Sequence, residues 1–289
     1  MGVGDVSAFL ELPAGRMHYE DEGPRWAETL LCLHGNPTWS FFYRGLVAGL
    51  CDRWRLVVPD HLGCGHSDKP LGWSYRLADH VANLERLVLA LDLREITLVL
   101  HDWGGAIGMG FARRHPERIA RLVILNTAAF PSPRMPWRIR ACRAPLVGPY
   151  MVRRWNAFAG LAPRMAVERK LPDEVREQFL APYDTPAHRI AIQRFVEDIP
   201  MSPAHPSWSE LEETGRALAS FADRPACIVW GEKDWCFTPR FREEWMRRLP
   251  KAEVHRLEHA GHWLLEDEPE QALGFVRGFL ERTPLAIAR

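Results

Sequence analysis

Six short strand-like runs, most of them continuously apolar, constrain the fold of this chain more than any other feature. They lie at residues 29–33, 55–58, 96–100, 121–125, 226–230 and 253–257. Apolar runs without alternation are typical of strands buried on both faces of a parallel sheet. Amphipathic helical segments lie between them, the clearest at residues 77–91, 106–115 and 239–249. This alternation predicts an α/β fold with a mostly parallel, doubly wound sheet.

The alternation stops between residues 127 and 220. This stretch carries twelve prolines and no convincing strand, only short helical pieces such as 173–180 and 187–196. We interpret residues 127–220 as a helical lid inserted into a core formed by residues 1–126 and 221–289.

Composition narrows the class of function. The chain has 37 Lys and Arg against 37 Asp and Glu, so its formal net charge is zero. That balance disfavours nucleic-acid and membrane-surface binding and favours small-molecule chemistry. Its six cysteines are scattered without a Cys-x-x-Cys pair, and no secretory signal or membrane-spanning apolar run is evident. We therefore expect a soluble, cytoplasmic protein whose cysteines are reduced.

The neutral total conceals two oppositely charged halves of the predicted lid. Residues 131–170 carry nine Lys and Arg against Glu168 alone, whereas residues 171–213 carry nine Asp and Glu against three Arg. We expect the two halves to pair with each other at a solvated surface. The alternative is a basic face that docks an acidic partner or another subunit.

Asp102 is the first candidate for a catalytic residue. It follows the predicted strand 96–100 and directly precedes a helix. A sharp strand-to-helix turn would lift its side chain above the sheet edge as a nucleophile, and Gly104 and Gly105 would let the helix pack closely. Leu100 stands where such turns usually carry a glycine. The plainer interpretation of Asp102 is a helix N-cap.

Two further side chains complete a possible triad. His262 lies in the loop after the last predicted strand, where it can face Asp102 across the carboxyl edge of the sheet and act as general base. Asp234 follows the preceding strand and could hold the imidazole in one tautomer, whereas Asn126 offers no carboxylate at the alternative position. The order nucleophile, acid, histidine is that of α/β hydrolases. His259 is a better candidate than His262 for a core histidine.

Two neutral donors are expected beside Asp102. The Asn36 amide and the Trp103 indole N–H would point into one pocket, where they suit a leaving halide or carboxylate without cancelling the charge of Asp102. The backbone N–H groups of the same two residues would form an oxyanion hole. More plainly, Asn36 could stabilise the turn before Pro37, and Trp103 could be a core residue. We interpret Asp60 as a structural residue of its loop.

Three motifs resemble the haloalkane dehalogenase family. They are His34-Gly35-Asn36-Pro37-Thr38-Trp39-Ser40, Pro59-Asp60-His61-Leu62-Gly63-Cys64-Gly65-His66-Ser67-Asp68-Lys69-Pro70 and His101-Asp102-Trp103-Gly104-Gly105. Lid segments resemble its third subgroup, which includes the β-lactone decarboxylases of bacterial long-chain olefin biosynthesis; these segments are 125–130, 156–158, 181–184 and 194–200. The resemblance covers nearly the whole chain.

The resemblance implies an α/β-hydrolase fold and specific roles for five residues. It implies that Asp102, Asp234 and His262 form the triad, and that Asn36 and Trp103 bind the leaving group. It also implies partner enzymes of the olefin pathway, and the chain could form a homo-oligomer.

An aspartate nucleophile forms an ester with its substrate, and two reactions can follow. In a dehalogenase, halide leaves and water activated by His262 hydrolyses the ester. In a β-lactone decarboxylase, Asp102 attacks the ring carbon that bears the lactone oxygen, and loss of CO₂ with departure of Asp102 gives an alkene. Attack at the lactone carbonyl is an open alternative. The lid segments favour decarboxylation of cis-β-lactones to long-chain olefins, with haloalkane hydrolysis as the alternative.

Other classes of function have less support. Epoxide hydrolysis would need lid hydroxyl donors, for which Tyr150 and Tyr183 are candidates, and Asn36 stands where that chemistry usually has an aromatic residue. A ligand receptor without catalysis is the alternative from another class. No grouping of histidines suggests a metal, and no glycine-rich cradle suggests a dinucleotide. We therefore expect catalysis without a cofactor.

Overall fold

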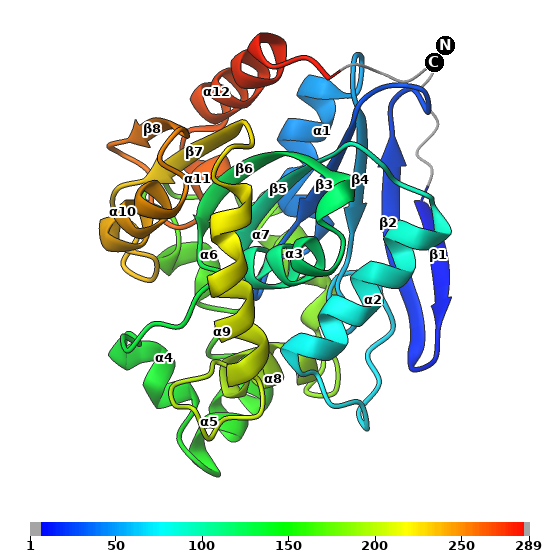
Figure 1. Ribbon diagram of the computed structural model, residues 1–289. Coiled ribbons are helices and arrows are strands. Elements are labelled where there is room, and N and C mark those ends of the chain that lie inside the picture. The colour runs from blue at the N-terminus through cyan, green and yellow to red at the C-terminus, as the bar shows by residue number, and fades with distance from the viewer. Residues whose placement is uncertain (1–6, 286–289) are drawn as a thin grey trace.

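The computed structural model describes residues 7–285, whose strands form one eight-stranded sheet (Figure 1). The strands are β1 (Ser7–Leu12), β2 (Gly15–Glu22), β3 (Thr29–Leu33), β4 (Arg55–Pro59), β5 (Ile96–Asp102), β6 (Ile119–Thr127), β7 (Ala226–Gly231) and β8 (Glu253–Leu257). Their order is β1-β2-β4-β3-β5-β6-β7-β8; β1, β2 and β4 pair antiparallel, and every pair from β4 to β8 is parallel. The predicted α/β class is confirmed, and each of the six predicted strands forms.

Helices cover both faces of this sheet. The α-helices are α1 (Arg44–Leu50), α2 (Leu77–Ala90), α3 (Trp103–Arg114), α4 (Trp137–Cys142), α5 (Val147–Pro149), α6 (Ala162–Met165), α7 (Asp173–Leu180), α8 (Ile190–Glu197), α9 (Trp208–Ala217), α10 (Pro239–Arg248), α11 (Leu264–Asp267) and α12 (Pro269–Arg282). Shorter helical turns are η1 (Ser40–Tyr43), η2 (Pro116–Arg118), η3 (Tyr150–Arg154), η4 (Ala181–Tyr183) and η5 (Leu218–Phe221). Among the described residues, no helix has the length and apolarity needed to cross a bilayer.

Burial on both faces explains why the central strands are continuously apolar. In β5, Leu98 and Leu100 belong to an apolar cluster that includes side chains of α2, α3 and α10, whereas Val99 belongs to a second cluster that includes side chains of α1 and α12. All three side chains are fully buried. Because successive side chains of a strand alternate between its faces, neither face of β5 can accept a polar residue at low cost.

The hairpin β1–β2 is absent from the sequence-based prediction. Its strands mix charged and apolar residues, and β2 is buried in pairs of residues rather than in alternation. Such a pattern matches neither the continuous nor the alternating template for a strand. The hairpin forms because β2 pairs antiparallel with β4, which adds it to the edge of the parallel part of the sheet.

Helices α4 to α9 lie between β6 and β7 in sequence and form the predicted lid. Figure 1 shows α4, α5 and α8 gathered at the end of the molecule opposite α12. Polar contacts tie the lid to the core: Arg76 bonds Asp198 at 2.7 Å, and the Asp267 carboxylate accepts the backbone N–H groups of Glu168 and Arg169 at 2.8 and 2.9 Å. Its extent as a separate domain, residues 127–220, stays a prediction.

Close packing of α3 against β3 makes one glycine essential. A Cβ atom at Gly104 would lie 2.0 Å from the Leu33 carbonyl oxygen. We expect Gly104→Ala to lower the free energy of unfolding by about 1–3 kcal/mol, because backbone must move to relieve the overlap. Gly274, exposed in α12 with no atom near its Cβ position, is the control. There, alanine should raise stability by roughly 0.5–1 kcal/mol. Urea unfolding of both variants checks the difference, and equal effects would contradict it.

Candidate active site

Asp102 occupies a strained turn where β5 ends and α3 begins. Its backbone has φ 49° and ψ −124°, a conformation that L-residues rarely adopt. The Thr127 hydroxyl donates a hydrogen bond to the Asp102 carbonyl oxygen. The turn therefore presents the Asp102 side chain at the carboxyl edge of the sheet, as the sequence predicts for a nucleophile.

A compensating glycine explains why this turn tolerates Leu100. Leu100 is fully buried beneath α3, and a Cβ atom at Gly108 would lie 2.4 Å from its Cδ2 atom. The small residue that the turn requires therefore lies on the helix rather than on the strand. Helix and strand still approach closely, so the departure from the usual motif leaves the turn intact.

The three residues predicted as a triad come together in the structure. His262 Nδ1 lies 2.8 Å from Asp234 Oδ2, and His262 Nε2 lies 3.6 Å from Asp102 Oδ2. All three side chains are buried. His101 lies against the imidazole, with ring centroids 4.6 Å apart, and its Nε2 contacts the His262 carbonyl oxygen at 2.9 Å. The imidazole is thus held between two carboxylates.

Asn126 positions the acid of this triad, a role that sequence reasoning missed. Its Nδ2 donates to Asp234 Oδ2 at 2.9 Å and to the Gly231 carbonyl at 3.1 Å, and its Oδ1 accepts the Gly231 N–H at 2.7 Å. The backbone N–H groups of Cys236 and Phe237 bond the other Asp234 oxygen. The signal available in sequence was a polar residue directly after a buried strand, at the same edge of the sheet as Asp102.

Asn36 and Trp103 also lie beside Asp102. The Asn36 backbone N–H donates to Asp102 Oδ1 at 2.6 Å, and one side-chain N–H of Asn36 donates to the Ile192 carbonyl of the lid at 3.2 Å. The Trp103 indole N–H donates to no residue that the structure describes, and its ring packs against Phe195 at 5.1 Å. One amide N–H and one indole N–H therefore stay available to a bound anion.

Burial and neighbouring charges shift the pKa values of Asp102 and His262. Burial raises the pKa of the Asp102 carboxyl, but its hydrogen bond with His262 and the charge of that ring hold it below the ordinary value. Burial lowers the pKa of His262, whereas the charge of Asp234 and contacts with both carboxylates raise it to about 10. At neutral pH the site therefore holds a protonated His262 beside an ionised Asp102.

An apolar cavity of about 440 Å³ adjoins the triad. Asp102, His262, Asn36 and Trp103 line it together with apolar lid side chains such as Phe158. A cavity of this size and character suits a small apolar ligand with one reactive polar group. The arrangement can therefore bring an electrophilic carbon of such a ligand to Asp102.

Comparison with known proteins identifies the family to which this chain belongs. The model of the α/β hydrolase fold matches residues 28–269. The chain belongs to the α/β hydrolase fold family. It is 46% identical to the cis-3-alkyl-4-alkyloxetan-2-one decarboxylase of Xanthomonas campestris over 94% of this chain and 95% of that protein. It is 31% identical to haloalkane dehalogenase 2 of Mycobacterium tuberculosis strain H37Rv, over 92% and 91%.

Solved structures agree with this family assignment. The haloalkane dehalogenase DbeA from Bradyrhizobium elkani superposes with a TM-score of 0.87 at 26% identity, over 96% of this chain and 99% of that chain. The resemblance to dehalogenases and β-lactone decarboxylases found in the sequence is thus confirmed.

The sequence also suggests His259 as a core histidine and Asp60 as a structural residue of its loop. His259 is exposed, so its assignment as a core histidine is wrong; the loop turns it outward while His262 points inward. Asp60 is structural as expected, since it is fully buried and accepts the backbone N–H groups of Ser40 and His66 and a bond from His18 Nδ1.

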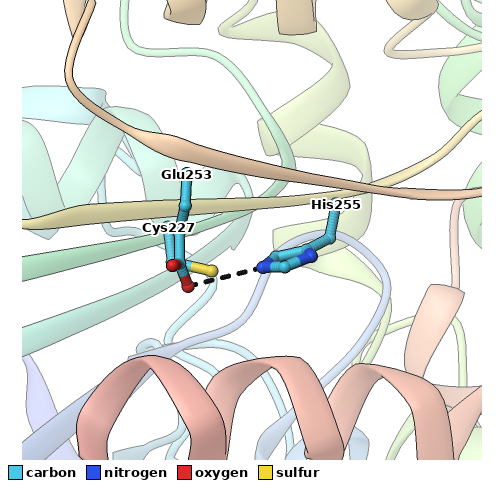
Figure 2. A group of neighbouring side chains, drawn as sticks. All are labelled: Cys227, Glu253 and His255. Carbon is cyan, nitrogen blue, oxygen red and sulfur yellow. Dashed lines mark hydrogen bonds and ion pairs between the residues drawn. The ribbon is translucent and has the colours of Figure 1, made fainter. Parts of the chain in front are cut away.

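A second cluster of side chains lies away from the triad, on β7 and β8. Figure 2 shows Cys227, Glu253 and His255 together, with potential ligand atoms within 4.8 Å of one another. Arg282 bonds both oxygens of Glu253 at 2.9 Å, and the His255 ring stacks on Phe275 at 4.0 Å. The His255 Nε2 atom lies 3.4 Å from Glu253 Oε1, so both side chains have polar partners within the protein. Strand pairing creates the cluster, so spacing along the chain does not reveal it.

Loss of the Asn126 amide should destabilise the folded protein. Asn126→Ala takes one hydrogen bond from the buried Asp234 carboxylate and leaves the buried Gly231 N–H without its Asn126 partner, so we expect a cost of about 1–3 kcal/mol. Asn83→Ala is the control, because the buried Asn83 Nδ2 bonds no described residue, and its removal should cost much less. Equilibrium unfolding in urea compares the two variants; equal losses would show that Asn126 does not hold the Asp234 loop.

Proposed function

We propose that this enzyme decarboxylates cis-β-lactones carrying two alkyl chains, giving alkenes and CO₂. One observation carries the proposal: the ionised Asp102 faces an apolar cavity beside two neutral donors, Asn36 and Trp103. Relatives at 46% and 42% identity are named cis-3-alkyl-4-alkyloxetan-2-one decarboxylases, and an oxetan-2-one is a β-lactone. An apolar cavity suits the alkyl chains, and the donor pair suits the carboxylate that ring opening releases.

The reaction proceeds in two steps that balance without a cofactor. Asp102 attacks the ring carbon bonded to the lactone oxygen, which forms an ester and opens the ring to a carboxylate. Asn36 and Trp103 donate hydrogen bonds to this new carboxylate. The carboxylate then leaves as CO₂, its electron pair forms the carbon–carbon double bond, and the ester bond breaks to restore ionised Asp102. Inversion followed by anti elimination converts a cis lactone into a cis alkene.

The shifted pKa values favour the second step. A carboxyl group with a lowered pKa is a better leaving group, and protonated His262 stabilises the Asp102 carboxylate as it departs. Asp234 and Asn126 keep the imidazole oriented toward it. His262 is thus a stabiliser of the leaving carboxylate in this reaction rather than a base.

Haloalkane hydrolysis is the second candidate, because the same donor pair suits a halide and relatives at 31% identity are named haloalkane dehalogenases. It requires neutral His262 to activate water. Esterification of Asp102 would favour this by removing one of the two anions that raise the pKa of His262. Epoxide hydrolysis has less support: Tyr183 is buried with its hydroxyl toward the Thr38 carbonyl, Tyr150 is exposed, and neither lines the cavity.

We also propose, from resemblance alone, that the protein acts in the cytoplasm with enzymes that make β-lactones. Association as a homo-oligomer is part of the same proposal.

A direct assay separates the two reactions. We expect the wild-type enzyme to convert a cis-3,4-dialkyl-β-lactone to the cis alkene, and to release little or no bromide from a bromoalkane of matched length. Asp102→Ala should lower alkene formation by about 10⁴-fold or more, because it removes the nucleophile. Gas chromatography measures the alkene, and ion chromatography measures the bromide. Bromide release without alkene, or full turnover by Asp102→Ala, would overturn the proposal.

The protonation states predict the pH dependence of alkene formation. The lowered pKa keeps Asp102 ionised from neutral pH down to about pH 5, so kcat/KM should stay level over that range. It should fall as pH rises toward about 10, where His262 loses its proton. In His262→Gln the residual activity should lack this upper decline. A rate that rises between about pH 6 and 9 would instead indicate a neutral histidine acting as base.

A further inference from the structure

The first half of the lid exposes an unusual amount of apolar surface. Of the eleven large hydrophobic side chains exposed among residues 7–285, six fall between residues 137 and 161. They are Trp137, Leu146, Val147, Tyr150, Trp155 and Leu161, and we term them the lid patch. Leu146 is 89% exposed and Trp155 66%. Figure 1 places α4 and α5, which carry part of this patch, at one extremity of the molecule.

The same segment carries cations that form no close ion pair with any carboxylate of the described residues. None of its nine cations has a carboxylate oxygen of residues 7–285 within 4.0 Å; they are Arg134, Arg138, Arg140, Arg143, Arg153, Arg154, Arg164, Arg169 and Lys170. Glu168, its single acid, pairs with Lys233 of the core at 3.4 Å.

Acids in the second half of the lid form ion pairs with arginines of the core. Asp198 pairs with Arg76 of the core, and Glu210 pairs with Arg113 and Arg114 of α3 at 3.0 and 3.1 Å. The prediction that the two halves of the lid pair with each other is therefore wrong. Core arginines pair with Asp198, Glu210 and Glu213, whereas Asp173 and Glu197 pair with arginines of their own half.

Two residues of the lid patch, Trp137 and Leu161, line the cavity. Five of the residues that line the cavity are exposed, and all belong to this half of the lid: Arg134, Trp137, Arg138, Ala141 and Leu161. Asp102 and His262, which line the same cavity, are buried. The exposed end of the cavity therefore lies in the first half of the lid, where two patch residues, Trp137 and Leu161, line it.

We infer that the lid patch and its cations dock on an anionic lipid surface, from which the substrate enters the cavity; this rests on the proposed function. Tryptophan and tyrosine beside arginine are typical of groups at a membrane interface, where apolar parts insert and guanidinium groups meet lipid phosphates. Uncompensated cations add attraction to anionic headgroups.

The position of the cavity favours lipid over an acidic protein. A protein bound to the patch would cover the opening, whereas a lipid surface joins it to the phase in which a dialkyl lactone dissolves. The absence of a spanning helix among the described residues makes this contact peripheral. A net charge of zero disfavours membrane-surface binding only as an average, because residues 131–170 carry nine cations against one acid.

Vesicle sedimentation tests the inference. We expect the wild-type protein to sediment with vesicles of phosphatidylcholine containing about 30% phosphatidylglycerol, and much less with phosphatidylcholine alone. Binding should fall severalfold between about 0.05 M and 0.5 M NaCl, because salt screens the attraction.

Paired variants assign the binding to this face. Leu146→Ser with Trp155→Ser, and Arg140→Glu with Arg154→Glu, should each reduce binding by about tenfold or more. None of these four residues lines the cavity. Trp26→Ser with Leu89→Ser removes exposed apolar side chains of the core, 75% and 46% exposed, and should bind as wild type. Arg16→Glu with Arg94→Glu makes the same change of net charge away from the lid and should also bind.

Activity separates this inference from the proposed function. All variants should convert a short-chain, water-dissolved β-lactone at the wild-type rate, whereas the two lid pairs should lose turnover of a long-chain lactone presented in anionic vesicles. Alkene formation without vesicle binding overturns lipid docking and leaves the decarboxylase. Vesicle binding without alkene formation overturns the decarboxylase and supports docking.

Other occupants of the patch give distinct results. If poly-glutamate binds through Arg140 and Arg154 but vesicles do not, the face recognises an acidic protein and the inference fails. It also fails if vesicles are ignored and the chain self-associates through Leu146 and Trp155, seen in size-exclusion chromatography.

Discussion

The passage of the chain from β5 into α3 at Asp102 is the constraint on which the site depends. A positive φ at this residue turns the chain sharply enough to raise its carboxylate above the sheet. The turn survives because α3 packs directly on β3, with Gly104 against the Leu33 carbonyl. Parallel strands then bring the loops after β7 and β8 to the same edge, so Asp234 and His262 reach Asp102 from distant parts of the sequence.

Placing one imidazole between two carboxylates couples the chemistry of all three groups. A buried Asp102 would hold its proton more tightly, yet the neighbouring His262 keeps it ionised. The same pairing keeps His262 charged, so the resting site holds a weakly basic Asp102 carboxylate, which we propose as both nucleophile and leaving group. That balance suits a reaction in which Asp102 bonds carbon and then departs. Hydrolysis of the ester would instead require His262 to lose its proton.

In the docking that we infer, the lid connects the site to the lipid surface from which the substrate enters. Its first half carries exposed apolar side chains and cations outside close ion pairs, and supplies the exposed residues that line the cavity. Its second half is tied to the core through Asp198 and Glu210. Because Asp198 and Glu210 pair with core arginines, the cations of the basic half form no close ion pair with them. The acidic half thus attaches the lid to the core, and the basic half presents an apolar and positively charged surface.

The sequence by itself determined the parallel strands, the turn at Asp102 and the order of the triad, because buried strands and turns leave local patterns of apolar residues and glycines. Only the tertiary structure decided what depends on pairing between distant segments. The hairpin β1–β2, the Asn126 clamp on Asp234 and the replacement of a strand glycine by Gly108 on α3 belong to this second group. The ion pairs of the lid also belong to this group, because the partner of each charged side chain depends on distances in the folded protein, and composition does not give these distances.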